Sequence, residues 1–351
     1  MPCWVKMWCV VAMSIWLGLL GLTSVRAQQE PLRVAATVPE LGSLAREVGG
    51  DQVTVVVFAK GTEDAHFVEA KPSFIKDLSQ ADVYIQVGME LETGWAPVLL
   101  QNARNSKILP GAPGYVDAST VITPLEVPIG PIDRSMGDVH PAGNPHYLTD
   151  PLNGLQVAQL LRDKFSMFRP AQQAYFAERY TAFRKHVWAA LVGETLAQKY
   201  DATKLAMLFE HGRLAAFLQS QNETHLLGGW LGELLPYTGT KAVADHNLWP
   251  YFARRFGLTL RGFMEPKPGI PPTTRHLREL VQAMQAEKIA IILTSAYYDP
   301  RHAQFLSQHT GAKVAPMAHQ VGARPGTDNY LGMLDYNVRQ LVAALENDRS
   351  K

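Results

Sequence analysis

Cysteine is nearly absent from this chain, with two occurrences in 351 residues, Cys3 and Cys9. Both lie in a segment with the features of a secretory signal. Lys6 supplies a positive charge, the run from Trp8 to Leu22 is apolar, and Val25-Arg26-Ala27 forms a small-x-small cleavage site. We expect cleavage after Ala27, so residues 1–27 are the signal peptide. The exported protein then has no cysteine, which excludes a disulfide framework and a thiolate metal site.

Long hydrophobic runs are also lacking after the leader, since no later stretch is apolar over the roughly 20 residues that a membrane-spanning helix needs. The apolar run of the leader is itself short for a membrane anchor, and Arg26 follows it closely. Neither cysteine follows an apolar run as it would at a lipoprotein attachment site. We therefore expect a periplasmic protein that is secreted through a cleaved signal peptide and is not lipid-anchored.

The positive and negative charges of the chain nearly balance. The chain has 33 Lys and Arg residues against 32 Asp and Glu residues, a formal net charge of +1. Without a basic stripe, nucleic acid is excluded as a partner. The length suits two ordinary domains, and we expect a monomer.

Two stretches of the chain alternate strand-like and helix-like segments. The apolar runs lack clean alternation, which is typical of parallel strands that are covered on both faces. The predicted strands are LRVAATV (32–38), QVTVVVF (52–58) and ADVYIQVG (81–88) in the first stretch, and KAVADH (241–246), LTLRGFM (258–264), IAIILTSA (289–296) and AKVAPMA (312–318) in the second. This alternation of strands and helices predicts an α/β protein of two lobes, each with a mainly parallel sheet flanked by helices.

A long helical segment separates the two stretches and begins at Pro170, a favoured first helical position. Its large apolar residues recur at spacings of three and four, on one face of a helix: Phe176, Tyr180, Phe183, Val187 and Leu191. If continuous to residue 200, this helix is ~45 Å long at ~1.5 Å per residue, and would be a rigid strut. We predict an N-terminal lobe over residues 28–168, a linking helix over 169–200 and a C-terminal lobe over 201–351.

Without cysteine, a strong transition-metal site must be built from histidine, and three of the 11 histidines stand out by position. His66 follows the strand that ends at Phe58, His246 ends the strand KAVADH, and His146 lies in the Gly/Pro-rich stretch GNPHYLTDP. Ligands of open α/β sheets bind at the carboxyl ends of strands. A cleft between the lobes would bring His66 and His246 together, and neutral imidazole suits zinc, copper, iron and nickel.

These histidines lie in motifs that together resemble the metal-binding receptors of ABC importers for zinc and manganese, the cluster with a rigid interlobe helix. The matching segments are Gly61 through His66 to Pro72, Asn144-Pro145-His146-Tyr147-Leu148-Thr149-Asp150-Pro151, and His246 with Tyr251, Phe252, Phe256 and Gly257; lesser matches are Gly88, Glu92, Trp95, Tyr330, Met333, Asn337 and Leu341. The resemblance spans almost the whole exported chain. It implies that His66, His146 and His246 bind a metal ion in the interlobe cleft, and that a membrane permease of an ABC importer receives it.

The chain departs from this family at its fourth metal ligand, an Asp or Glu shortly after the last strand. The matching stretch here reads APMAHQVGARPGTDNY, so His319, His140, Glu210, His211 or a water is left to complete the site. Asn144 and Thr149 also replace family residues, and the region around residues 205–230 resembles an insertion. Three imidazoles without a clear carboxylate favour Zn²⁺ as the transported ion, with Mn²⁺ second.

The sequence thus predicts a binding protein that captures zinc and delivers it to an importer, and not an enzyme. A zinc-dependent hydrolase is the main alternative, because three histidines and an open position also suit metal-activated water. There is no HExxH pair, and only Glu63, Asp64 and Glu210 are candidate general bases. A receptor for a metal chelate or another small organic ligand, and a surface adhesin, are further alternatives.

Overall fold

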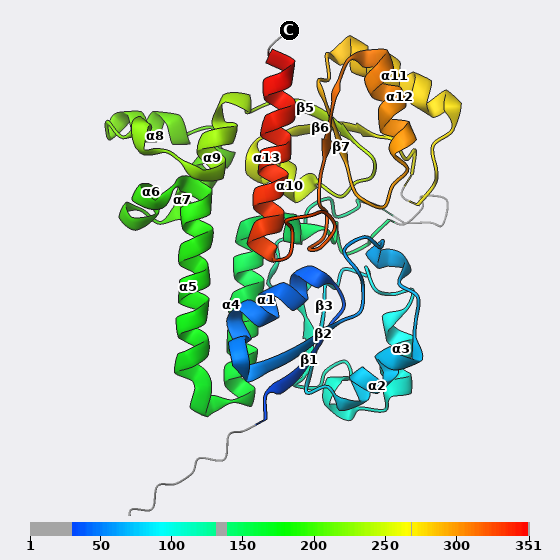
Figure 1. Ribbon diagram of the computed structural model, residues 1–351, viewed down its shortest axis with the longest axis vertical. Helices are drawn as coiled ribbons and strands as arrows, with labels where there is room; N and C mark the ends of the chain where they lie inside the picture. Colours follow the sequence, from blue (N-terminus) through cyan, green and yellow to red (C-terminus); the bar gives the residue numbers. More distant parts are fainter. Residues whose placement is uncertain (1–29, 131–138, 268, 350–351) are drawn as a thin grey trace, which may run out of the picture. The chain divides into compact units, whose positions relative to one another are not determined.

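Two four-stranded parallel sheets organise the chain, one in each half of the sequence (Figure 1). The computed structural model describes residues 30–130, 139–267 and 269–349, so the predicted signal peptide lies outside the described residues. The strand orders are β2-β1-β3-β4 and β6-β5-β7-β8. The strands are β1 (Leu32–Ala36), β2 (Val53–Val57), β3 (Val83–Gln86), β4 (Tyr115–Asp117), β5 (Lys241–Ala244), β6 (Thr259–Phe263), β7 (Ile291–Thr294) and β8 (Lys313–Pro316).

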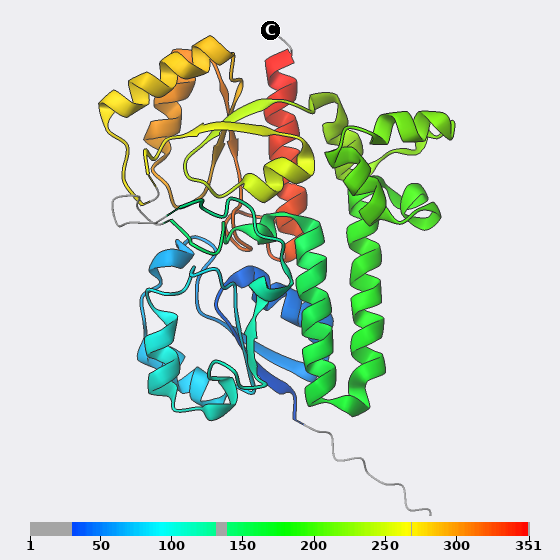
Figure 2. The same ribbon diagram turned by 180° about the vertical axis from the view of Figure 1, so that it is seen from behind.

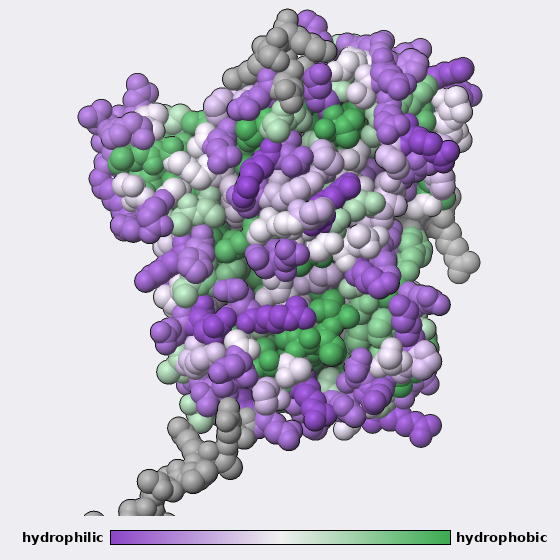
Figure 3. Space-filling model, in the orientation of Figure 1, coloured by the Kyte–Doolittle hydropathy of each residue, from purple (hydrophilic) through white to green (hydrophobic). Residues whose placement is uncertain are grey.

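All of the predicted strands are present, which confirms two parallel lobes. The sequence did not reveal β4, which is three residues long and follows a stretch rich in glycine and proline. Central strands are buried on both faces: Ile291, Ile292 and Leu293 of β7 are 0 % exposed. The edge strand β2 is only partly buried beyond its first residue, and Figure 3 shows hydrophobic surface over the part of the first lobe where β2 lies.

Helices cover both sheets. In the first lobe α1 packs on β1 and β2, and α2 packs on β1; in the second, α13 packs on β8, and α12 packs on β7 and β8. The helices are α1 (Pro39–Gly49), α2 (Pro72–Gln80), α3 (Ala96–Ala103), α4 (Pro151–Phe168), α5 (Gln173–Val192), α6 (Glu194–Lys199), α7 (Ala202–Glu210), α8 (Leu214–Ser220), α9 (Gly229–Leu234), α10 (Pro250–Phe256), α11 (Thr274–Glu287), α12 (Pro300–Thr310) and α13 (Tyr330–Arg349).

The long helix between the lobes is α5, which lies antiparallel beside α4 (Figure 2). It also contacts α1 of the first lobe, and α7 and α9 further along the chain. Its predicted apolar face is buried as expected, with Phe176, Val187 and Leu191 at 0 % exposure. The helix ends at Val192, shorter than the continuous segment to residue 200 that the sequence suggested. Gly193 adopts φ +83° and ψ 154°, outside the helical region, so the helix ends there; a Cβ at this position would also lie 3.1 Å from Gly228 Cα.

A buried ion pair joins the two lobes. Asp150, just before α4, is fully buried, and Arg255 on α10 is 4 % exposed. Arg255 Nε donates to both carboxylate oxygens of Asp150, at 2.9 and 3.1 Å. Because Asp150 also accepts from the backbone N–H of Leu152 and so caps α4, the same carboxylate fixes a helix of one half and a helix of the other.

Two buried tyrosine hydroxyls add to this connection. Tyr251 on α10 accepts a hydrogen bond from the Leu125 N–H at 2.9 Å and donates to the Asn144 carbonyl oxygen at 3.0 Å. Tyr330, which begins α13, donates to the carbonyl oxygens of Leu148 and Asp150 at 2.8 and 3.1 Å. The second lobe therefore holds the backbone on both sides of residue 146.

The loop after β8 packs closely on the first lobe. The buried carboxyl of Glu40 accepts from the Val321 N–H at 3.0 Å, and burial raises the pKa of Glu40 to about 8. A Cβ on Gly61 would lie 2.2 Å from the Val321 carbonyl oxygen, so only glycine fits at this contact. These contacts oppose a large swing of one lobe against the other.

The ion pair predicts a large effect on stability. Arg255→Gln leaves the fully buried Asp150 carboxylate without its cation, and should lower the free energy of unfolding by about 3–5 kcal/mol. Chemical denaturation of the purified protein measures this. Arg275→Gln is the matched control, because Arg275 is 89 % exposed in its pair with Glu279 and should cost at most about 0.5 kcal/mol. Equal losses in the two variants would contradict the role given to the buried pair.

Candidate metal site

The three histidines singled out from the sequence lie together where the two lobes meet. The ring centroids are 5.4 Å apart for His66 and His146, 6.1 Å for His66 and His246, and 6.0 Å for His146 and His246. His66 follows β2 and His246 follows β5, both at the carboxyl ends of parallel strands, as the sequence rule anticipates. The structure thus brings the predicted residues together, and their role as metal ligands stays a prediction.

His66 is oriented by a carboxylate and by its own loop. Asp64 accepts from the backbone N–H of His66 at 3.0 Å, and its Oδ1 lies 2.7 Å from the ring Nδ1. Although burial raises the pKa of Asp64, the hydrogen bond to His66 and the charge of that ring outweigh it, and the pKa lies below its usual value. The indole of Trp95 donates to the Ala65 carbonyl oxygen at 3.0 Å. Nδ1 is therefore engaged, and Nε2 is the nitrogen left for a ligand.

His246 has the same arrangement in the other lobe. Its Nδ1 lies 2.6 Å from Glu265 Oε2, and its backbone N–H donates to Asp245 Oδ1 at 2.9 Å. Tyr298 stacks on the ring, with centroids 6.0 Å apart and planes at 23°. Sequence reasoning missed Glu265, although it follows the carboxyl end of β6, the strand next to β5. Applied to every strand, the rule that found the histidines would have found it.

His146 is buried, at 5 % exposure, and is held through its backbone. Its N–H donates to the side-chain oxygen of Asn144 at 3.0 Å, and its carbonyl oxygen accepts from the Thr149 hydroxyl at 2.9 Å. Asn144 also donates to the carbonyl oxygen of Asn247 at 2.9 Å, across the cleft. Burial, reinforced by the neighbouring imidazoles, lowers the pKa of His146 well below its ordinary value, so the ring is neutral, as metal binding requires.

Two of the four side chains considered for a fourth position lie beside the three histidines. His140 Nε2 is 3.1 Å from His66 Nε2, and the His319 ring centroid is 4.8 Å from that of His146. Burial lowers the pKa of His140 to about 4 and that of His319 to about 3. A cavity of about 300 Å³, lined in part by His140, His146 and His246, opens onto this cluster.

The other two candidates lie elsewhere. The Glu210 carboxylate pairs with Arg254 and Arg255, at 3.4 and 3.3 Å. His211 is an exposed residue at the end of α7. Neither contacts the histidine cluster, which we define as His66, His140, His146, His246 and His319. The region that resembles an insertion instead forms α7, α8 and α9, whose α7 packs on α10.

The cluster is not arranged as a finished coordination shell. Within residues 30–130, 139–267 and 269–349, no three His, Cys, Asp or Glu side chains are placed so that they could hold one metal ion together. In the pair His66 and His140, the two Nε2 atoms lie 3.1 Å apart, at hydrogen-bonding distance. Rotation of these rings would be needed before their nitrogens converged on one point.

Known proteins match this chain over most of its length. The family model described as ZnuA, zinc-uptake complex component A, periplasmic, matches residues 34–219 and 228–344. The metal ABC transporter substrate-binding lipoprotein SloC of Streptococcus mutans is 20% identical over 342 residues, covering 96% of this chain and 97% of SloC. The manganese ABC transporter substrate-binding lipoprotein PsaA of Streptococcus pneumoniae is 20% identical over 337 residues, covering 93% and 94%.

A solved structure has the same fold. The crystal structure of ZnuA aligns with a TM-score of 0.63 at 18% identity, over 90% of this chain and 99% of that one. Among the residues that our structure describes, no helix has the length and apolarity to cross a bilayer. SloC and PsaA are named lipoproteins, so the expectation that this chain has no lipid anchor finds no support among them.

The family match leaves out residues 220–227, which lie within the region that resembles an insertion. On either side it includes the segments of His66, His146 and His246, both sheets and the long helix α5. From the extent of this match, the chain belongs to the ZnuA family of substrate-binding components of metal ABC transporters.

Proposed function

We propose that this protein captures a zinc ion between its lobes with His66, His146 and His246, and delivers it to the permease of an ABC importer. The observation that supports this best is the gathering of five imidazoles from both lobes, three of which (His140, His146 and His246) line one cavity. Buried neutral imidazole is a good ligand for zinc. The names of the relatives, which are metal ABC transporter substrate-binding proteins, support delivery to an importer.

Zinc is proposed over manganese because nitrogen dominates the cluster. Manganese favours sites with more carboxylate, and the two carboxylates in contact with the cluster rings, Asp64 and Glu265, lie against ring Nδ1 atoms. In that position they orient imidazoles and raise their basicity. The matching family is described as zinc-uptake, whereas PsaA is named for manganese, so the names of relatives do not decide the metal.

Capture by this cluster would involve side-chain rotation rather than lobe closure. The interlobe ion pair and the tyrosine hydrogen bonds fix the backbone around the cleft. The contact between His66 and His140 must open for Nε2 of His66 to bind an ion. We propose that the importer recognises the ordering of the histidine loops that accompanies this rotation.

The hydrolase alternative has less support. Asp64 is engaged with His66, and Glu210 is paired with Arg254 and Arg255. Glu63, the third candidate general base, forms an ion pair with Lys60 at 3.0 Å. Each of the three carboxylates considered from the sequence as a general base is thus already paired with a neighbouring side chain. We propose a transport role outside the cytoplasmic membrane, as the leader sequence suggests.

The ligand assignment predicts the effect of removing each imidazole. His66→Ala, His146→Ala and His246→Ala should each weaken zinc binding by more than about 100-fold, beyond the 10–100-fold typical for loss of an outer-shell partner. Competition with a chromophoric chelator measures the affinity. His211→Ala is the matched control, because His211 is exposed and remote from the cluster. The zinc affinity of this variant should equal that of the wild type. Unchanged zinc affinity in all three cluster variants would refute the site.

The preference for zinc is tested by introducing a carboxylate into the histidine cluster. Zinc binds more tightly than manganese to most protein sites, so the ratio of the two affinities is the useful quantity. His319→Asp places an oxygen ligand beside His146, and should raise the manganese affinity relative to the zinc affinity by about tenfold or more. The titrations use the folded, metal-free protein, checked by circular dichroism. A ratio equal to that of the wild type would mean that His319 does not shape the choice of metal.

A further inference from the structure

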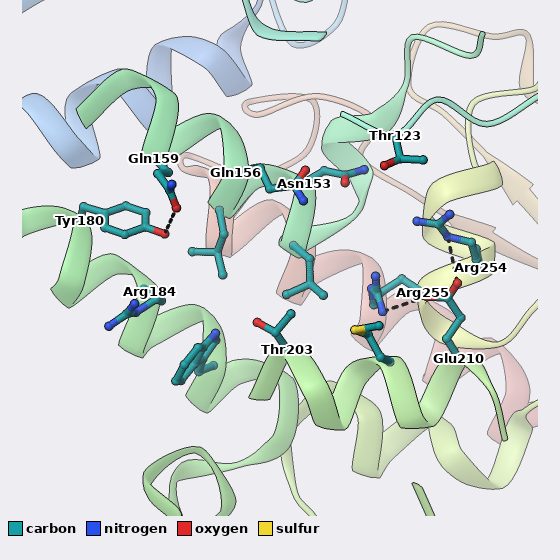
Figure 4. Close-up of a pocket in the computed structure, with 14 residues that line it drawn as sticks. Thr123, Asn153, Gln156, Gln159, Tyr180, Arg184, Thr203, Glu210, Arg254 and Arg255 are labelled. Carbon is teal, nitrogen blue, oxygen red and sulfur yellow. Dashed lines mark hydrogen bonds and ion pairs between the residues drawn. The ribbon is translucent and has the colours of Figure 1, made fainter. Parts of the chain in front are cut away.

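A second cavity, of about 460 Å³, lies between α4, α5, α7 and α10 (Figure 4). This volume falls in the range of small-molecule sites. No histidine is among its lining residues, so it is separate from the histidine cluster. The proposed zinc capture makes no use of it.

The lining of this cavity is rich in cations. It includes three guanidinium groups, of Arg184, Arg254 and Arg255, and one carboxylate, of Glu210. Arg255 is neutralised by Asp150 behind it, and Glu210 lies against Arg254 and Arg255. In Figure 4 this paired group lies at one end of the cavity and Arg184 at the other. The Arg184 end therefore keeps a positive charge.

Two buried donors at that end are unsatisfied. In the described part of the chain, Arg184 Nε and Trp188 Nε1 have no hydrogen-bond partner. The residues are four apart on α5 and so share a face of the helix. The guanidinium carbon of Arg184 lies 5.1 Å from the Trp188 ring centroid and 5.9 Å from that of Tyr180, and this stacking restrains the side chain. Leaving a buried donor unpaired is unfavourable, so a ligand that accepts from both groups would be stabilised.

The rest of the lining combines apolar and amide side chains. Leu152, Leu155 and Met207 supply apolar surface, while Gln156 and Gln159 supply amides that can contact a polar ligand. One charged donor (Arg184) and one neutral donor (Trp188) beside apolar walls are complementary to a carboxylate attached to a hydrocarbon body. A bare inorganic anion would leave the apolar walls uncovered.

We propose that this cavity is a binding site for a small organic carboxylate, whose oxygens accept from Arg184 Nε and Trp188 Nε1. The ligand's hydrocarbon part packs against Leu152, Leu155 and Met207. The site is independent of metal capture and goes beyond the proposed transport function.

Calorimetric titration of the metal-free exported protein with glutarate, phenylacetate and inorganic phosphate tests this. At least one of the two carboxylates should bind saturably with one site per chain, and more tightly than phosphate. Arg184→Gln should weaken that binding by about tenfold or more, because a charge-assisted hydrogen bond is lost. Trp188→Phe, which keeps an aromatic ring and removes the N–H, should weaken it in the same direction.

Lys185→Gln is the matched control, since Lys185 is the exposed neighbour on the same helix and loses the same charge. It should bind the carboxylate as the wild type does. Absence of saturable carboxylate binding, tighter binding of phosphate, or equal weakening by Lys185→Gln would overturn the proposal. Zinc affinity is measured on the same variants and should be unchanged in Arg184→Gln, so that a failure here is distinguishable from a failure of the zinc site.

Discussion

The buried ion pair between Asp150 and Arg255 determines how the two lobes present their histidines. Asp150 lies four residues after His146 and caps α4, while Arg255 lies on the helix that follows His246. Because both groups are almost fully buried, separating them would expose uncompensated charges to a low-dielectric interior. The pair therefore ties the His146 loop of one half to the His246 loop of the other. The hydrogen bonds of Tyr251 and Tyr330 reinforce the same junction.

Under the proposed function, this junction would let the protein bind its ion with little movement of one lobe against the other. With the backbone fixed, the remaining freedom is in the imidazole rings, and each lobe restrains one ring through a carboxylate, Asp64 for His66 and Glu265 for His246. Such partners set the ring orientation and leave the outer nitrogen for an ion. Burial keeps the other rings neutral, since the pKa values of His140 and His319 lie at about 4 and 3. His140 and His319 would therefore release no proton on meeting a cation near neutral pH.

Much of the fold could be predicted from the sequence, because buried parallel strands and the apolar face of α5 are periodic signals. The gathering of His66 and His246 followed from their positions at strand ends. The features that could not be predicted from the sequence depend on contacts between segments that are far apart in the chain. The end of α5 at Val192 coincides with the positive φ of Gly193, which lies against Gly228, and the role of Glu265 depends on the position of β6 beside β5. His211 and Glu210 were candidate ligands by residue type alone, and the structure directs them away from the cluster.

If imidazoles from both lobes bind the ion, X-ray absorption spectroscopy of the zinc-loaded protein will detect them in its coordination shell. We expect a first shell of nitrogen or oxygen ligands at about 2.0–2.1 Å, with outer-shell scattering from at least three imidazole rings. In the His246→Ala variant, one ring should be lost from that signal. A shell made mainly of oxygen, with fewer than three imidazoles in the wild-type protein, would contradict capture of the ion by the histidine cluster.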